Sequence, residues 1–66
     1  MTDETGFPRA IGKVARRELA VHGITRYGQL AERTEREVLA IHGVGPKAVG
    51  ILRAELAERG LHFRSE

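Results

Sequence analysis

Residues 41–50 have the sequence IHGVGPKAVG, which places two glycines and a proline within four positions of a chain whose remaining pattern is helical. Glycine is the costliest residue to order, and proline has no backbone N–H. We expect Gly43 to end one helix with a positive φ, and Val44 to point back into the core. Pro46 should begin the next helix, where its missing N–H costs no hydrogen bond. The stretch therefore predicts a tight hairpin between two helices.

The sequence on either side of this hairpin predicts further helices. It is rich in Ala, Leu, Arg and Glu and shows no strand-like alternation. We expect helices over about residues 13–22 and 25–33, a third beginning at Thr34, and a fourth from Pro46 to Gly60. Thr25 is the expected N-cap of the second helix, and Thr34 with Glu37 matches a capping box. The expected fold class is all-α, a compact bundle of four or five helices.

Apolar residues at helical spacing indicate the buried faces. The residues expected to face the core are Val14, Ala15, Leu19 and Val21, then Tyr27, Leu30 and Ala31, and finally Ala48, Val49, Leu52 and Leu56; Val38, Leu39 and Ile41 follow the third cap. Three glycines are each followed by an apolar residue, which predicts left-handed helix ends at Gly23-Ile24, Gly43-Val44 and Gly60-Leu61. Leu61 and Phe63 should then close the core.

A weak internal repeat is also present. Ile11-Gly12-Lys13 leads into a helix ending RELAVHGI, and Val44-Gly45-Pro46-Lys47 leads into one ending RAELAERGL. This similarity predicts two hairpin-plus-helix units related by a pseudo-twofold axis, with both hairpins facing the same ligand.

Length and composition limit the class of protein. A chain of 66 residues predicts one small domain, over residues 7–63, between a disordered tail at 1–6 and a short tail at 64–66. The absence of cysteine excludes disulfides and thiolate metal sites. MTDETG is polar, so no signal peptide is expected, and no apolar run approaches the roughly 20 residues of a membrane span. We therefore expect a cytoplasmic location, with the nucleoid as a further one.

The predicted hairpin has the chemistry of an anion site. Gly45 carries no side chain that would hold a ligand away from the backbone. The helix that begins at Pro46 should present free N–H groups and the positive end of its dipole, which favour a phosphate oxygen. Lys47 adds a positive charge in the first turn, where a lysine is unfavourable for the helix alone. The net charge of +2 is too small to decide the partner, but Arg9, Lys13, Arg16 and Arg17 crowd the first helix.

The stretch LAIHGVGPKAV resembles the helix-hairpin-helix motif, in which an apolar residue stands between two glycines before a helix. In that family, hairpin amides bind nucleic-acid phosphates without reading bases. From Gly23 to Phe63 the chain looks like the C-terminal domain of the bacterial RNA polymerase alpha subunit, because QLAERTEREVLAIHGVGPKAVGILRAELAERGLHF carries its helix, hairpin, helix and RGL ending in order. It also resembles small stand-alone bacterial proteins described as DNA-binding. The resemblance implies a tandem helix-hairpin-helix fold of the SAM-like type.

Two departures from the polymerase domain bear on specificity. Gly45 and Lys47 match positions that contact DNA there, and Arg17 falls on a polar contact position. The serine that follows in that domain is Ala48 here, and the arginine that enters the minor groove falls on Val14, with Lys13 and Arg17 as neighbours. The resemblance thus implies phosphate binding, without the A/T preference.

The sequence therefore predicts a non-enzymatic module that binds DNA backbone with little base specificity. The predicted contact residues are Gly43, Val44, Gly45, Lys47, Gly12, Lys13, Arg16 and Arg17. For each of them the alternative is a purely structural turn or a solvated helix face. His22, His42 and His62 are too widely spaced for a metal site, and no catalytic arrangement or nucleotide loop is present. No cofactor, membrane or small-molecule substrate is expected, and duplex, single strand and RNA remain open.

A protein-interaction module is the alternative function. In that case Gly50 and Ile51 on the last helix, with Tyr27, would form an apolar contact surface for a partner protein.

Overall fold

The computed structural model describes residues 7–65, and this part of the chain forms four α-helices and one 3₁₀-helix. In order they are η1 (Arg9–Ile11), α1 (Lys13–Val21), α2 (Tyr27–Leu30), α3 (Glu35–Leu39) and α4 (Pro46–Glu58). The described residues contain no strand, only an isolated parallel bridge between Thr34 and Arg64. The expected all-α class is confirmed. The predicted tail at 1–6 lies outside the described residues.

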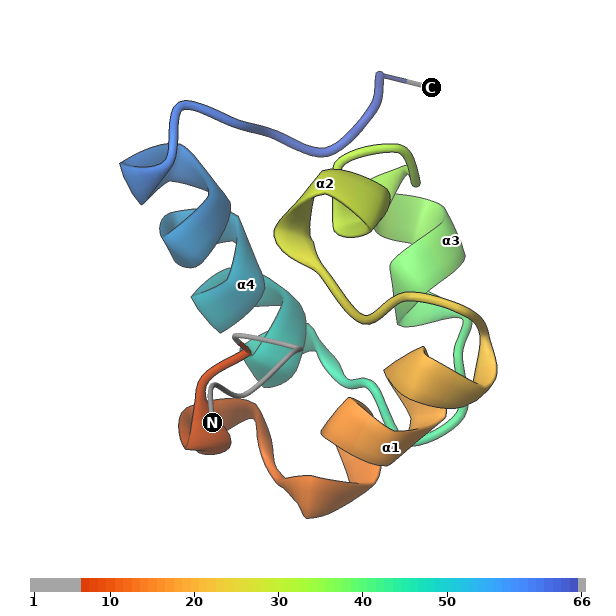
Figure 1. The fold of residues 1–66 in the computed structure, drawn as a ribbon. Helices are drawn as coiled ribbons and strands as arrows, with labels where there is room; N and C mark the ends of the chain where they lie inside the picture. The colour runs from red at the N-terminus through yellow and green to blue at the C-terminus, as the bar shows by residue number, and fades with distance from the viewer. Residues whose placement is uncertain (1–6, 66) are drawn as a thin grey trace.

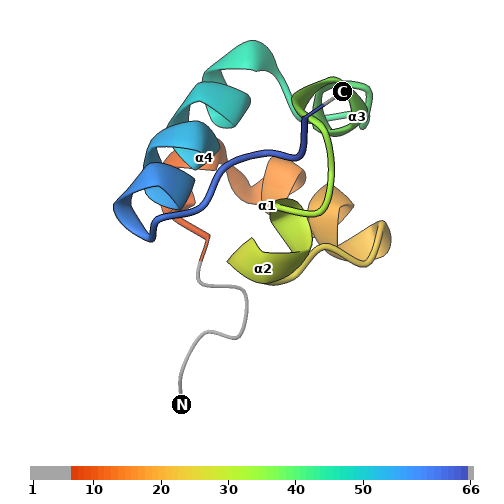
Figure 2. The ribbon, with the colours of Figure 1, turned by 90° about the horizontal axis from the view of Figure 1, so that it is seen from above.

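The helices are arranged around α4, the longest element. Figures 1 and 2 show α4 on one side of the molecule and α1, α2 and α3 on the other, with the C-terminal segment returning from the end of α4 towards α2 and α3. Among residues 7–65, no helix has both the length and the hydropathy needed to span a membrane.

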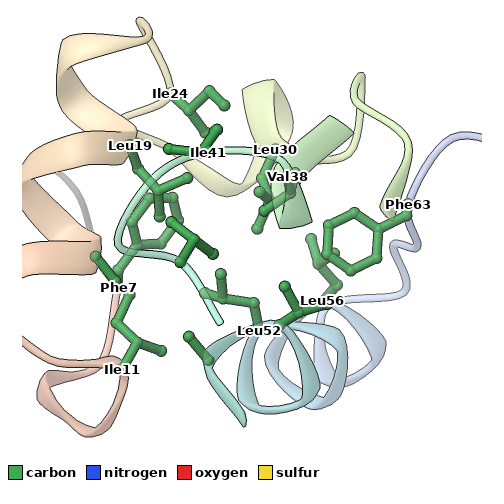
Figure 3. Close-up of a cluster of buried hydrophobic side chains, with 14 residues drawn as sticks. Phe7, Ile11, Leu19, Ile24, Leu30, Val38, Ile41, Leu52, Leu56 and Phe63 are labelled. Atoms are coloured by element: carbon green, nitrogen blue, oxygen red, sulfur yellow. The ribbon is translucent and has the colours of Figure 1, made fainter. Parts of the chain in front are cut away.

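Every helix contributes to one core. Figure 3 shows the buried side chains converging between α4 and the other elements; those labelled are Phe7, Ile11, Leu19, Ile24, Leu30, Val38, Ile41, Leu52, Leu56 and Phe63. The α4 prediction is confirmed, because Ala48, Val49, Leu52 and Leu56 are all buried. Phe7 and Phe63 lie near opposite ends of the described chain, so the core ties both ends into the fold.

The inward face of α1 differs from the predicted one. Ala15 and Leu19 are buried as expected, but Val14 and Val21 are 49% and 70% exposed. The buried row begins at Ile11 in η1 and continues at intervals of four residues through Ala15 to Leu19. Val14 and Val21 lie beside this row, so the prediction was wrong for both.

The start of α2 also differs. The N-cap is Arg26 rather than Thr25. Gln29 Oε1 accepts hydrogen bonds from the backbone N–H groups of Thr25 and Arg26, at 2.8 and 3.0 Å, and from the Thr25 hydroxyl at 3.0 Å. The capping oxygen therefore comes from inside the helix. Beyond Ala31 the N–H groups of Glu32 and Arg33 donate to carbonyls three residues back, as in tighter turns, so α2 is shorter than predicted.

The start of α3 agrees with the sequence. Thr34 Oγ1 accepts a hydrogen bond from the Glu37 N–H at 3.1 Å, and Glu37 Oε1 accepts one from the Thr34 N–H at 2.9 Å. This reciprocal pair is the predicted capping box.

Two of the three predicted glycine stops are confirmed. Gly23 and Gly60 have φ of 78° and 73°, and the N–H of the following residue reaches back to a carbonyl in the last helical turn, Ile24 to Leu19 and Leu61 to Leu56, both at 2.8 Å. Gly43 does not end α3 in this way, because the helix has already ended at Leu39. The positive φ of Gly43, 90°, belongs to a separate turn.

The C-terminal segment closes the core as expected. Phe63 is buried and Leu61 packs against the core. The Arg64 N–H donates to the Arg33 carbonyl at 2.9 Å, and the Arg64 guanidinium lies 3.6 Å from the Glu37 carboxylate. Arg64, predicted as the first residue of a tail, is thus attached to the turn between α2 and α3.

Candidate functional site

The hairpin between α3 and α4 is an exposed bend held by buried residues on both sides. The Val44 N–H donates to the Ile41 carbonyl at 3.0 Å, which closes a four-residue turn with Gly43 in its third position. A φ of 90° at that position is typical of a type II turn, which favours glycine. Ile41 and Val44 are buried, whereas His42 and Gly43 are exposed. Val44 therefore anchors the bend from inside, as the sequence predicted.

Gly43 is required by the fold. A Cβ built on it would lie 2.7 Å from Val14 Cγ1 and 3.3 Å from Glu18 Cγ, in addition to the strain of a positive φ. Val14 and Glu18 are one turn apart on α1. The hairpin therefore lies directly against this face of α1, where Figure 1 shows the connection to α4 running beside the helix.

Gly45 has no comparable role in the fold. Its φ of −100° and ψ of 179° are extended backbone that any residue can adopt. No atom of the described residues lies within 4 Å of a Cβ built there. Gly45 is the N-cap of α4, a position at which Ser, Asn or Asp would bond the free amides of the first turn. Neither backbone geometry nor packing within residues 7–65 explains the glycine.

The hairpin carries backbone donors without partners. Within the described part of the chain, the N–H groups of Gly43, Gly45 and Lys47 donate no hydrogen bond, whereas the Val49 N–H donates to the Gly45 carbonyl at 3.0 Å and begins the helical ladder. Gly43 and Lys47 are exposed and Gly45 is half-buried. Lys47 forms no ion pair with any residue in 7–65, and the first turn of α4 contains no acidic residue. The arrangement offers donors and positive charge to an anion.

The predicted second group of site residues lies at the start of α1. Gly12 is the N-cap of α1, with φ of 96° and ψ of 155°, a combination that essentially only glycine adopts. Lys13 and Arg17 are exposed and Arg16 is half-buried. Gly12 and Gly45 thus both precede a helix as N-caps, as the sequence repeat suggests, but their φ angles differ in sign.

The two groups adjoin through Val14, which touches Gly43. On the α1 surface, Lys13 precedes Val14 and Arg17 lies one turn beyond it, so both cations border the face that carries the hairpin. Sequence reasoning did not identify Glu18 as part of this neighbourhood. Its proximity to Gly43 depends on how α1 and the hairpin pack, and no local motif signals it.

Residues 7–65 line no pocket and bring together no group of three or more His, Asp or Glu side chains that could hold a metal ion. No family model, curated protein or solved structure matches the chain. The function is therefore inferred from the geometry of the hairpin itself.

Proposed function

We propose that this chain is a non-enzymatic nucleic-acid-binding module of the tandem helix-hairpin-helix type. The hairpin from Gly43 to Lys47 binds DNA backbone phosphates through its free amides and Lys47, with little dependence on base sequence. Gly12, Lys13, Arg16 and Arg17 at the start of α1 bind a neighbouring part of the same backbone.

The single observation that carries this proposal is Gly45. At this position the fold accepts a side chain, and a serine or aspartate would cap α4 better. A glycine is useful there if a ligand approaches the amides closely, because any side chain would stand between the backbone and a phosphate oxygen. The free N–H groups and the exposed Lys47 provide what that oxygen needs.

The binding should be weak and salt-dependent. A site that neutralises only a few phosphates has a Kd of about 10⁻⁴ to 10⁻⁶ M near physiological salt, and its affinity falls as salt rises. Lys47→Glu should weaken binding by about tenfold or more, and it should reduce the slope of log K against log salt by roughly one. Arg33→Glu is the matched control, because Arg33 is exposed, lies in the turn between α2 and α3, and undergoes the same charge reversal.

The decisive variant is Gly45→Ser. Its hydroxyl should accept hydrogen bonds from the amides that begin α4, so the helix keeps or gains a few tenths of a kcal/mol of stability. The same hydroxyl occupies the donors that a phosphate needs, and DNA affinity should fall several-fold. Titration of labelled duplex DNA at about 50 mM salt, with thermal unfolding in parallel, measures both effects. The proposal is wrong if wild type does not bind, or if Gly45→Ser and Lys47→Glu bind as wild type does.

A protein-interaction role is the second candidate. Val14 and Val21 are exposed and lie two turns apart on one face of α1, which gives a partner protein apolar surface. The surface first expected for this role, around Tyr27 and Ile51, offers less, because both side chains pack against the core. Capture of a partner that survives nuclease treatment and high salt would favour this role over DNA binding.

A further inference from the structure

Glu18 is a side chain beside the hairpin whose negative charge repels an anion. Its Cγ would lie 3.3 Å from a Cβ on Gly43, and its side chain is half-buried against the bend. Among residues 7–65, the Glu18 carboxylate forms no hydrogen bond and no ion pair. The imidazole one turn on, His22, bonds the Glu18 backbone carbonyl through Nδ1 at 2.9 Å rather than the carboxylate. The Glu18 side chain, whose carboxylate has no partner among residues 7–65, therefore lies beside Gly43 of the hairpin.

We infer that Glu18 shifts the selectivity of the hairpin site towards phosphodiesters and away from phosphomonoesters, an inference that rests on the proposed function. Each internal phosphate of a nucleic-acid backbone carries one negative charge, whereas a phosphomonoester carries about two at pH 7 and above. Repulsion from a nearby carboxylate is proportional to that charge. The amides and Lys47 attract the doubly charged ligand more strongly by the same proportionality, and Glu18 offsets this advantage because it repels the dianion about twice as strongly on a free-energy scale.

The size of the effect follows from Coulomb's law at a protein surface. For charges about 5–8 Å apart in a largely aqueous dielectric, one carboxylate weakens the binding of a single negative charge by roughly three- to tenfold. For a dianion the free-energy penalty doubles, so the same carboxylate weakens binding by roughly ten- to hundredfold. Glu18 thereby shifts binding towards internal backbone positions and away from terminal phosphates and small phosphorylated molecules.

The test is an NMR titration of wild type and Glu18→Gln with two probes, a short duplex DNA with unphosphorylated ends and methyl phosphate. Glu32→Gln is the control, because Glu32 is exposed in the turn after α2 and loses the same charge. Glu18→Gln should raise the affinity for the duplex by roughly three- to tenfold and the affinity for methyl phosphate by a larger factor. Glu32→Gln should change either affinity by less than about twofold, because solvent and salt screen the charge of this exposed side chain.

The two proposals fail in different ways. Suppose that the duplex binds, but that Glu18→Gln has the same affinities as Glu32→Gln, or raises the affinity for methyl phosphate by no larger factor than the affinity for the duplex. The selectivity role of Glu18 is then wrong and the proposed function stands. If methyl phosphate binds at the hairpin but the duplex binds to none of the three proteins, the anion site stands and the proposed function is wrong. If neither probe shifts the hairpin resonances in any variant, both proposals are wrong.

Discussion

Replacement of Gly43 by alanine tests whether the hairpin depends on its contact with α1. Two costs add in the folded state. An L-residue with a left-handed backbone is strained by about 1–2 kcal/mol. In addition, the new Cβ would lie 2.7 Å from Val14 Cγ1, well inside the ordinary carbon contact of about 3.5–4.0 Å. Relief of such an overlap costs about 1–3 kcal/mol in a packed region.

One smaller term opposes these costs. Alanine reduces the conformational freedom of the unfolded chain, which returns about 0.4–1 kcal/mol. The net loss expected for Gly43→Ala is therefore about 2–4 kcal/mol. A chain of 66 residues has a total stability of about 3–10 kcal/mol at roughly 0.05–0.15 kcal/mol per residue. The substitution should thus lower Tm by roughly 10–25 °C, at about 4–8 °C per kcal/mol for a domain of this size.

Thermal and urea unfolding, followed by far-ultraviolet circular dichroism, measure this loss, and a double-mutant cycle with Val14→Ala separates its parts. The Val14→Ala variant lacks Cγ1, so Gly43→Ala should cost only about 1 kcal/mol in that background, the backbone strain less the unfolded-chain term, with a coupling of about 1–3 kcal/mol. Gly28→Ala is the control, because Gly28 lies in α2 with open space around it and should gain up to about 1 kcal/mol. An equal cost of Gly43→Ala in both backgrounds would refute the role assigned to the Val14 contact.

Two further substitutions test other parts of the fold. Thr34→Ala removes the hydroxyl that accepts a hydrogen bond from the Glu37 N–H. Because Thr34 is buried, the free energy of unfolding measured in urea should fall by about 1–2 kcal/mol. A loss below a few tenths of a kcal/mol would contradict the role of the capping box. Phe63→Ala should lower the free energy of unfolding by about 3 kcal/mol. It should also selectively speed hydrogen exchange of the Arg64 amide, which donates to the Arg33 carbonyl. Unchanged protection of this amide would show that the C-terminal segment is held without Phe63.

The parts of the fold that follow from local chemistry were predictable from the sequence. The capping box at Thr34 and the stop at Gly60 involve residues within one or two turns, so a few letters determine them. The second cap was mispredicted because Gln29 competes with Thr25 for the same role, and the threonine hydroxyl donates to it rather than capping the helix itself. Residue propensities alone do not show which of these two side chains caps the helix.

The candidate site was predictable only in its backbone. Glycine and proline spacing indicated a bend with free amides, because φ preferences and missing donors are intrinsic to those residues. The neighbours of the bend were not predictable. Val14 was assigned to the core, yet it lies exposed against Gly43, and Glu18 was not predicted to lie beside the hairpin. Both positions depend on how α1 packs against the hairpin. The spacing of apolar residues along a single helix does not show which other segments contact it.

The helix starts of this chain differ in a way that stability alone does not explain. At α3 the chain uses a reciprocal threonine–glutamate cap and places Glu35 and Glu37 in the first turn, which suits the helix dipole. At α1 and α4 it uses glycine caps, no acidic residue in the first turn, and a lysine within that turn. The glycine cap of α1 is required by its backbone angles, but the one of α4 is not.

A domain of this size has a small free energy of unfolding, so each unfavourable interaction matters. The missing side-chain cap and the unfavourable lysine at α4 together cost up to about 1 kcal/mol, out of a total of roughly 3–10 kcal/mol. A residue that lowers the stability of its helix, with no compensating gain elsewhere in the fold, is a candidate for a functional role. An anion bound at Gly45 and Lys47 would reverse both penalties at once, since it would satisfy the amides and neutralise the charge. Binding should therefore stabilise wild type more than Gly45→Ser, and an equal rise in Tm for both proteins at saturating duplex DNA would contradict this account.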